Sequence, residues 1–280
     1  MVPLALGVLA VLLVWVTPAV LARQLPFRHA PRAALVAWQS VSLGGMLAAV
    51  FVAPAAVVVL AGRDGIARHP WLVAVGAVVS GAVLLRVAVS GHLVGTRVRA
   101  ARARHRDLVD IVAEHERDGL RVLQHPTATA YCIPGRSSRV VLSQGVLDTL
   151  PPPELAAVIA HEKAHLRARH DLLLEFFTVL HESVPSAFRS RRALAEVRLL
   201  VEALADRAAV RTSGEVATAR ALVAIAESRS PDAAMGAGTS APVRMQLLVA
   251  GPRPELAAVA YLIAVAALLA PLGLLSLVLG

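Results

Sequence analysis

The stretch AVIAHEKAHLRARHD, residues 157–171, contains two histidines four residues apart with a glutamate directly after the first. Three prolines at 151–153 precede it and suit the first turn of a helix. On a helix, His161 and His165 share one face, and two imidazoles one turn apart can hold a zinc ion. Glu162 stands where a general base would lie beside that ion. A pair of surface histidines on a basic helix is the alternative that this stretch leaves open.

The composition predicts an integral membrane protein. Hydrophobic residues make up 57% and charged residues 17% of the 280 residues, and the mean hydropathy is +0.66, well above the usual soluble mixture. The first apolar run lacks the basic start of a signal peptide, and Arg23 follows it, so we interpret it as an uncleaved span. Four apolar runs can each cross a bilayer as a helix: residues 2–22, 33–61, 71–95 and 256–279.

Arginines beside the spans set the expected orientation. The loop after the third span opens with a cluster of five: Arg97, Arg99, Arg102, Arg104 and Arg106. Because positive charge favours the cytoplasmic side, we expect a multi-pass cell-membrane protein whose third loop faces the cytoplasm and whose N-terminus lies outside. Arg86 lies inside the third span near its inner end, where its long side chain can serve as an anchor at the headgroups.

The excess of positive charge is assigned to the membrane. The formal net charge is +9, but no aromatic residues interleave with the arginines, so we expect contact with anionic lipid and no direct binding of nucleic acid. Cys132 is the single cysteine, which excludes an internal disulfide and suits a reducing compartment. We interpret its side chain as part of a packed core.

The expected organisation is three transmembrane helices in residues 1–96, a cytosolic zinc domain in 97–254 and a fourth transmembrane helix in 255–280. Within the domain, apolar spacing predicts a helix over 108–123, and residues 131–143 predict two short strands around a Pro-Gly turn. Three further segments follow: a packed or interfacial helix over 171–185, a long helix over 187–212 and a glycine-containing break over 235–242.

A catalytic zinc site needs a third protein ligand, and the carboxylates after the histidines are Asp171, Glu175, Glu182, Glu196, Glu202 and Asp206. Glu202 and Asp206 lie one turn apart on an otherwise apolar helix, where carboxylates are costly unless paired or metal-bound. We assign Glu202 as the third ligand and Asp206 as the group that orients a ligand histidine. Glu196 is assigned to a solvated salt bridge with its neighbours Arg191, Arg192 and Arg198. In the open alternative, Glu202 and Asp206 pair with Arg198 and Arg207 on an ordinary helix.

Together, the motif His161-Glu162-Lys163-Ala164-His165 and the later Glu202-Ala-Leu-Ala205-Asp206 resemble the Glu-zincin pattern of integral-membrane metallopeptidases. Two groups share that pattern: HtpX with the CaaX-type proteases, and the BlaR/MecR antirepressor peptidases. Four spans with the zinc motif between the third and the fourth resemble the second group. The implied fold is a mainly α membrane protein with four transmembrane helices and an α+β metallopeptidase domain inserted between spans three and four.

The resemblance implies a membrane-embedded zinc endopeptidase with one Zn²⁺ per chain. It would cleave a cytosolic protein, a BlaI/MecI-like transcriptional repressor, in signal-dependent gene regulation. The first alternative is an HtpX-like protease for membrane-protein quality control. The second, a non-catalytic zinc-binding receptor, fits poorly with an intact Glu162. The best-known antirepressor peptidases carry an extracellular sensor after the fourth span, whereas we expect none here. An external signal would then come from a membrane sensor partner, from the lipid or through the spans themselves.

Three finer expectations concern substrate handling. An extended substrate would add to the edge of the small sheet, with either YCIPG, residues 131–135, or RVVLS, residues 139–143, as the receiving strand. Tyr131 and Arg207 are the candidates for the oxyanion donor. The segment 235–249 joins the zinc domain to the last span, and we expect it to control access to the site.

Overall fold

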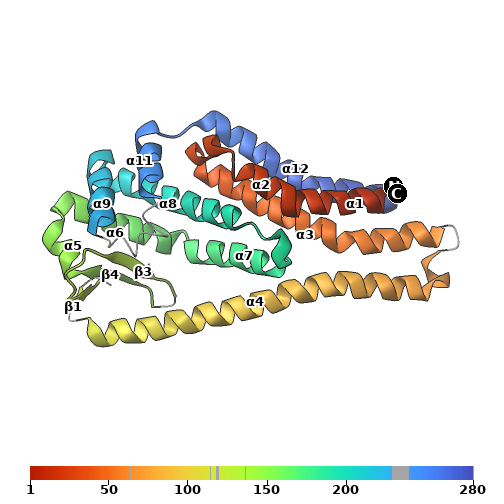
Figure 1. The fold of residues 1–280 in the computed structure, drawn as a ribbon, viewed down its shortest axis with the longest axis horizontal. Coiled ribbons are helices and arrows are strands. Elements are labelled where there is room, and N and C mark those ends of the chain that lie inside the picture. Colours follow the sequence, from red (N-terminus) through yellow and green to blue (C-terminus); the bar gives the residue numbers. More distant parts are fainter. Residues whose placement is uncertain (63–64, 114, 118–119, 136, 229–239, 280) are drawn as a thin grey trace. The chain divides into compact units, whose positions relative to one another are not determined.

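The computed structural model describes residues 1–280 except 63–64, 114, 118–119, 136, 229–239 and 280 (Figure 1). The chain divides into two compact units. One comprises residues 1–94, 176–197 and 253–280, and the other comprises 95–175 and 198–252. Three helices begin in one unit and end in the other: α4 (Pro70–Val112), α7 (His170–Ser183) and α8 (Arg191–Ser213).

The first unit contains the apolar helices. The N-terminal run is α1 (Val2–Val11), the π-helical turn η1 (Leu12–Val16) and α2 (Thr17–Leu21), and η2 (Leu25–His29) leads into α3 (Pro31–Ala61). After α3, η4 (Ile66–Arg68) precedes α4, η5 (Ser186–Phe188) lies between α7 and α8, and α12 (Pro254–Leu279) ends the unit. Among the described residues, four helical stretches are long and apolar enough to cross a membrane: Val2–Leu21, Pro31–Ala61, Pro70–Val112 and Pro254–Val278.

Close packing of α3 depends on small residues. It packs along α1 and α12, as Figure 1 shows. A Cβ atom on Gly44 would lie 2.1 Å from the carbonyl oxygen of Ala267, so the backbones of α3 and α12 approach as only a glycine permits. Small residues at such contacts are typical of helices that associate in lipid.

Arg86 has a partner that the sequence did not indicate. Its Nε donates a hydrogen bond to the backbone carbonyl oxygen of Ser183, at the end of α7. The last carbonyl groups of a helix have no partner within the helix, and a cation there also complements the helix dipole. Arg86 therefore caps α7, and its role as an anchor at the headgroups stays a prediction.

The second unit is built on a small sheet with strand order β1-β2-β4-β3. The pairs β1–β2 and β3–β4 are antiparallel, whereas β2–β4 is parallel. The strands are β1 (His115–Arg117), β2 (Leu120–Leu123), β3 (Ala130–Ile133) and β4 (Arg139–Ser143). The helices of this unit, besides the parts of α4, α7 and α8, are α5 (Gln144–Thr149), α6 (Pro152–Arg167), α9 (Glu215–Ser228) and α11 (Ala241–Ala250).

Alternation along the strands gives the sheet two apolar faces. Ala130 and Cys132 pack on the face shared with α6 and α9, in a core that includes Ala157 and Val158. Tyr131 and Ile133 pack on the opposite face, together with Val109 of α4. The sheet is therefore covered on both faces by helices, which is the arrangement that fixes α6 beside β3.

The expected helix over 108–123 is wrong in its second half. Helix α4 ends at Val112, and the following residues form the paired strands β1 and β2, with Arg117 opposite Leu120. The sequence between these two residues is Asp118-Gly119, the dipeptide that most strongly favours a two-residue hairpin turn, and it lies outside the described residues. The predicted pair of strands around Pro134-Gly135 is confirmed as β3 and β4.

Candidate metal centre

Helix α6 presents the two motif histidines on one face. It begins at Pro152, carries Glu154 in its first turn, and buries Ala157 and Val158 against the sheet. His161 and His165 follow one turn apart, and their Nε2 atoms lie 3.2 Å from each other. The helix that was expected from the prolines and the apolar spacing therefore brings both imidazoles to one point.

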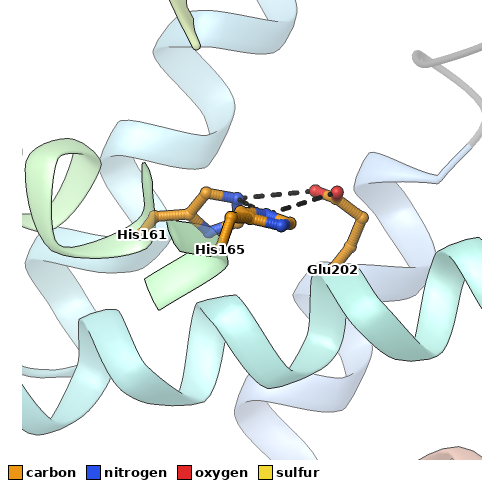
Figure 2. Close-up of side chains that lie close together, drawn as sticks. All are labelled: His161, His165 and Glu202. Atoms are coloured by element: carbon orange, nitrogen blue, oxygen red, sulfur yellow. Dashed lines mark hydrogen bonds and ion pairs between the residues drawn. The ribbon is translucent and has the colours of Figure 1, made fainter. Parts of the chain in front are cut away.

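Glu202 comes to the same point from α8, and Figure 2 shows its carboxylate facing the two imidazole rings. Glu202 Oε2 lies 3.5 Å from His161 Nε2, and Oε1 lies 3.5 Å from His165 Nε2. These three residues form the one group among the described residues whose ligand atoms are arranged to hold a metal ion.

The spacing of these donor atoms suits zinc. In a tetrahedral zinc site with ligands at roughly 2.0–2.1 Å, the donor atoms lie about 3.3 Å apart. The two Nε2 atoms lie 3.2 Å apart, and each lies 3.5 Å from a different oxygen of the Glu202 carboxylate, which is close to that value. Two imidazole nitrogens and one carboxylate oxygen are also ligands that zinc prefers, and three protein ligands leave a fourth position for water or substrate.

Asp206, one turn after Glu202 on α8, contacts the other nitrogen of His161. Its Oδ1 lies 3.0 Å from His161 Nδ1, and its side chain is only 4% exposed. A carboxylate in this position fixes the ring and leaves Nε2 for the site. The structure thus places Glu202 beside the Nε2 atoms of both histidines and Asp206 beside Nδ1 of His161.

His170 is a neighbour of the site that the sequence analysis missed. Its Nδ1 lies 3.0 Å from Nδ1 of His165, and the residue is buried. The chain reaches this position because α6 ends at Arg167 and Arg169 adopts a positive φ of 49°, a conformation uncommon outside glycine. His170 then begins α7 and points back at His165, a placement that depends on the turn and is not visible in the spacing.

Arg244 of α11 is the second neighbour that was missed. Its Nη1 lies 3.0 Å from Glu202 Oε2. Its Nε and Nη2 donate to the two oxygens of Asp206 at 2.7 and 2.5 Å. We expected a break over 235–242 and, over 235–249, a segment that controls access to the site. Ala241–Ala250 is instead the helix α11, and residues 235–239 lie outside the described residues.

The charges around the histidines set their proton affinities. Burial opposes protonation of His161, but hydrogen bonds to Asp206 and Glu202 outweigh it and raise the pKa of His161 to about 9. Burial lowers the pKa of His165 to about 4, with a further contribution from the positive charge of His161. Burial disfavours the charged form of Glu202, but His161 and Arg244 outweigh it and lower the pKa of Glu202 to about 2.

Glu162 is largely buried and shares a hydrogen bond with Cys132 of β3. Burial raises the pKa of Glu162, although the positive charge of His161 and a hydrogen bond from the Cys132 thiol oppose the shift. Burial and the Glu162 charge also raise the pKa of Cys132. The thiol is therefore neutral beside the carboxylate, which extends the sequence-based view of Cys132 as a packed side chain.

The other carboxylate candidates for a third ligand are in ion pairs with arginines. Asp171 lies 3.1 Å from Arg102, and Glu182 lies 2.8 Å from Arg189. Glu175 lies 3.8 Å from Arg102 and 3.9 Å from Arg99.

Glu196 differs from its expected role. It accepts two hydrogen bonds from Arg28, at 2.7 and 2.6 Å, and it is buried. The expected solvated salt bridge with the neighbouring arginines Arg191, Arg192 and Arg198 is wrong, because a partner 168 residues away occupies the carboxylate.

Tyr131, one of the two oxyanion candidates, lies on the face of the sheet opposite α6. Its ring centroid is 5.3 Å from that of His105, and it packs in the cluster of Val109, Ile133 and Val141. It is therefore a core residue. The half-buried Arg207 follows Asp206 on α8, where burial and the nearby Arg211 lower its pKa.

Comparison with known proteins identifies the family of the chain. The model of Peptidase family M48 matches residues 99–258, which is more than half of the 280-residue chain and includes every residue of the candidate metal centre. No curated protein and no solved structure matches the chain. The chain belongs to Peptidase family M48, a family of zinc-dependent, membrane-associated metallopeptidases that includes HtpX and the CaaX-type proteases.

Proposed function

We propose that the chain is a membrane-embedded zinc endopeptidase in which His161, His165 and Glu202 hold one zinc ion and Glu162 is the general base. The observation that carries the proposal is the close approach of the donor atoms: the two Nε2 atoms lie 3.2 Å apart, and each lies 3.5 Å from one oxygen of the Glu202 carboxylate. Membership of a metallopeptidase family supports the same assignment. The proposed organisation keeps the boundaries expected from the sequence, with a zinc domain over 97–254.

When bound, zinc would supply a Lewis acid that makes a water molecule more acidic and polarises the scissile carbonyl group. Glu162 takes the proton from the attacking water and delivers it to the leaving amine. Its raised pKa suits this task, because a base whose pKa is moved toward neutrality can also return the proton. Asp206 holds His161 with its Nε2 directed at the site.

An extended substrate would pair with β3. In the described part of the sheet, β4 lies between β2 and β3, so its backbone hydrogen bonds are taken by both neighbours. This removes RVVLS as the receiving strand. β3 is at the edge of the described sheet, contacts α6, and carries Cys132 beside the proposed base. A substrate strand added there gains main-chain hydrogen bonds next to Glu162.

For the substrate, we propose a cytosolic repressor, in line with the resemblance to antirepressor peptidases and with the cytoplasmic orientation that the arginines after the third span predict. The four apolar helices, with the metal motif between the third and the fourth, support this reading. The second candidate is quality control of membrane proteins, which is favoured by membership of the family that includes HtpX.

The chemical proposal is tested on the purified full chain in lipid nanodiscs. We expect about one zinc ion per chain in the wild type and in Glu162→Gln, because the glutamate is not a ligand. The wild type should cleave a casein substrate, and Glu162→Gln should not. Loss of zinc in Glu162→Gln would contradict the assignment of base and ligands, and retained turnover would contradict the base.

The substrate proposal is tested by comparing the proteomes of a wild-type and a Glu162→Gln strain. A single winged-helix regulator that is cleaved only in the wild type would support the antirepressor role. Accumulation of many misfolded membrane proteins in the Glu162→Gln strain would support quality control instead.

A further inference from the structure

The guanidinium of Arg244 has no part in the chemistry proposed above, yet it contacts two of its residues. Two of its nitrogens hold both oxygens of Asp206, at 2.7 and 2.5 Å, and the third lies 3.0 Å from Glu202 Oε2. This fork-like arrangement fixes both the position and the rotation of a carboxylate, which a single point charge does not.

Each contact of Arg244 leads to a different ligand. Asp206 Oδ1, which accepts from Arg244 Nη2, is the same oxygen that lies 3.0 Å from His161 Nδ1. Glu202 Oε2, which faces Arg244 Nη1, is the same oxygen that lies 3.5 Å from His161 Nε2. One side chain therefore sets the orientation of two of the three proposed ligands, His161 through Asp206 and Glu202 directly.

Burial makes this dependence strong. The side chains of Arg244 and Asp206 are 15% and 4% exposed. Without the guanidinium, Asp206 would be a buried carboxylate that still contacts the His161 ring, and Glu202 would lose a cation beside it. Buried carboxylates that lose a partner reorient or take up a proton, and either change releases the ring that they held.

Arg244 also connects α11 to the site. α11 packs against α9 and buries Leu247 and Leu248, and Arg244 is its contact with Glu202 and Asp206 of α8. A group that binds the metal ligands only when its helix is docked makes the two events reinforce each other, since coupling between two equilibria is reciprocal.

Resting on the proposed zinc site, we propose that Arg244 is a positioning residue for that site, which holds His161 through Asp206 and Glu202 directly and so makes tight zinc binding depend on a docked α11. The residue touches no reacting atom in this proposal. Its effect appears in metal binding before it appears in turnover.

The test measures zinc affinity by competition with a chromophoric chelator, using the full chain in nanodiscs. Arg244→Met should bind zinc about 10- to 100-fold more weakly, the range typical for residues that orient metal ligands. Arg244→Lys should recover part of this loss, because lysine keeps the charge but not the fork. Arg220→Met on the exposed side of α9 is the matched control and should bind zinc as the wild type does.

Two further readouts separate positioning from general loss of folding. Substitution by Co²⁺ should give a shifted visible spectrum in Arg244→Met, because the ligand geometry changes, and an unchanged one in Arg220→Met. Zinc should slow amide hydrogen exchange across residues 241–250 in the wild type, and this protection should be lost in Arg244→Met. Asp206→Asn combined with Arg244→Met should weaken zinc binding by less than the product of the single effects, because both act on His161.

Unchanged zinc affinity and Co²⁺ spectrum in Arg244→Met would overturn the proposal, whatever happens to turnover. A lower kcat with unchanged metal binding would instead place Arg244 against the substrate and would equally overturn it. If the wild type binds no zinc, the proposed zinc site fails as well, so the two failures are distinguishable.

Discussion

Helix α8 carries two carboxylates that pair with arginines of other elements, one pair in each compact unit. In the first unit, Glu196 accepts two hydrogen bonds from Arg28. In the second unit, Asp206 accepts two hydrogen bonds from Arg244. The local geometry of the pairs is similar, but Asp206 also contacts His161, whereas Glu196 belongs to the unit of the apolar helices. A buried ion pair can therefore serve the proposed metal site only when one of its partners also contacts that site, as Asp206 does.

The two glutamates of α8, Glu202 and Glu196, should differ most in their effect on zinc binding. Glu202→Ala should abolish tight zinc binding, with a loss larger than the roughly 10- to 100-fold effect of residues around the ligands. Glu196→Ala should keep one zinc ion per folded chain. Metal content and chelator competition on both variants check this expectation. Normal zinc binding by Glu202→Ala together with loss in Glu196→Ala would exchange the roles of the two pairs.

Removing one partner of the first pair should mainly reduce stability. Arg28→Met leaves Glu196 as a buried charge, with side-chain exposures of 18% for Arg28 and 9% for Glu196 in the intact pair. Breaking such a pair costs about 3–5 kcal/mol, whereas replacing both partners by apolar residues is often nearly neutral. Unfolding of Arg28→Met and of the double variant Arg28→Met/Glu196→Met in detergent measures both effects. A double variant as unstable as the single one would rule out the ion pair as the cause.

His170 should have a smaller effect than Asp206. As a ligand through Nε2, His165 carries its proton on Nδ1 and donates it to Nδ1 of His170, whose pKa is lowered by burial so that the ring is neutral. A neutral acceptor orients a ligand less strongly than a carboxylate. His170→Leu should therefore weaken zinc binding by about tenfold, at the low end for such residues, and Asp206→Asn by more. His170→Asn, which keeps an acceptor close to the Nδ1 position, should bind zinc nearly normally, and a His170→Leu variant weaker than Asp206→Asn would reverse this ranking.

The smallest expected difference between the two pairs is in the pH dependence of zinc binding. Because the pKa of metal-free His161 is raised to about 9, this ring is protonated at pH 7 and must lose its proton to bind zinc. The apparent Kd should therefore fall by about tenfold per pH unit between pH 6 and 8 and level off above the pKa. His165, with a pKa of about 4, adds nothing in this range. Asp206→Asn should flatten the slope, because it removes the main group that raises the pKa, while Glu196→Gln should leave it unchanged.

The sequence predicted the features of the site that depend on the spacing of residues within one helix. The spacing of His161 and His165 requires only a helix, and that helix is present. The choice of Glu202 over the other carboxylates followed from two charges on an apolar helix face, and the structure brings Glu202 to the histidines. The spans followed from apolar length alone, although α4 continues without a break from Pro70 to Val112.

Long-range partners were beyond the reach of the sequence. Arg244 lies 38 residues from Asp206, and Arg28 lies 168 residues from Glu196, so no spacing rule connects them. His170 depends on the positive φ of Arg169, which no local signal announces in a non-glycine residue. The prediction of one helix over 108–123 gave too little weight to Asp118-Gly119, which favours a hairpin turn. The apolar residues before this dipeptide are spaced as in a helix, and that spacing decided the prediction.

In the proposed site, two imidazoles and one carboxylate hold the zinc ion. X-ray absorption at the zinc edge of the purified chain tests it most directly. We expect only nitrogen and oxygen neighbours at about 2.0–2.1 Å, with the outer-shell pattern of two imidazole rings, and loss of this signal in His161→Ala. A zinc–sulfur distance of about 2.3 Å would place Cys132 among the ligands, and a spectrum without imidazole rings would exclude His161 and His165; either result would rule out the proposed ligand set.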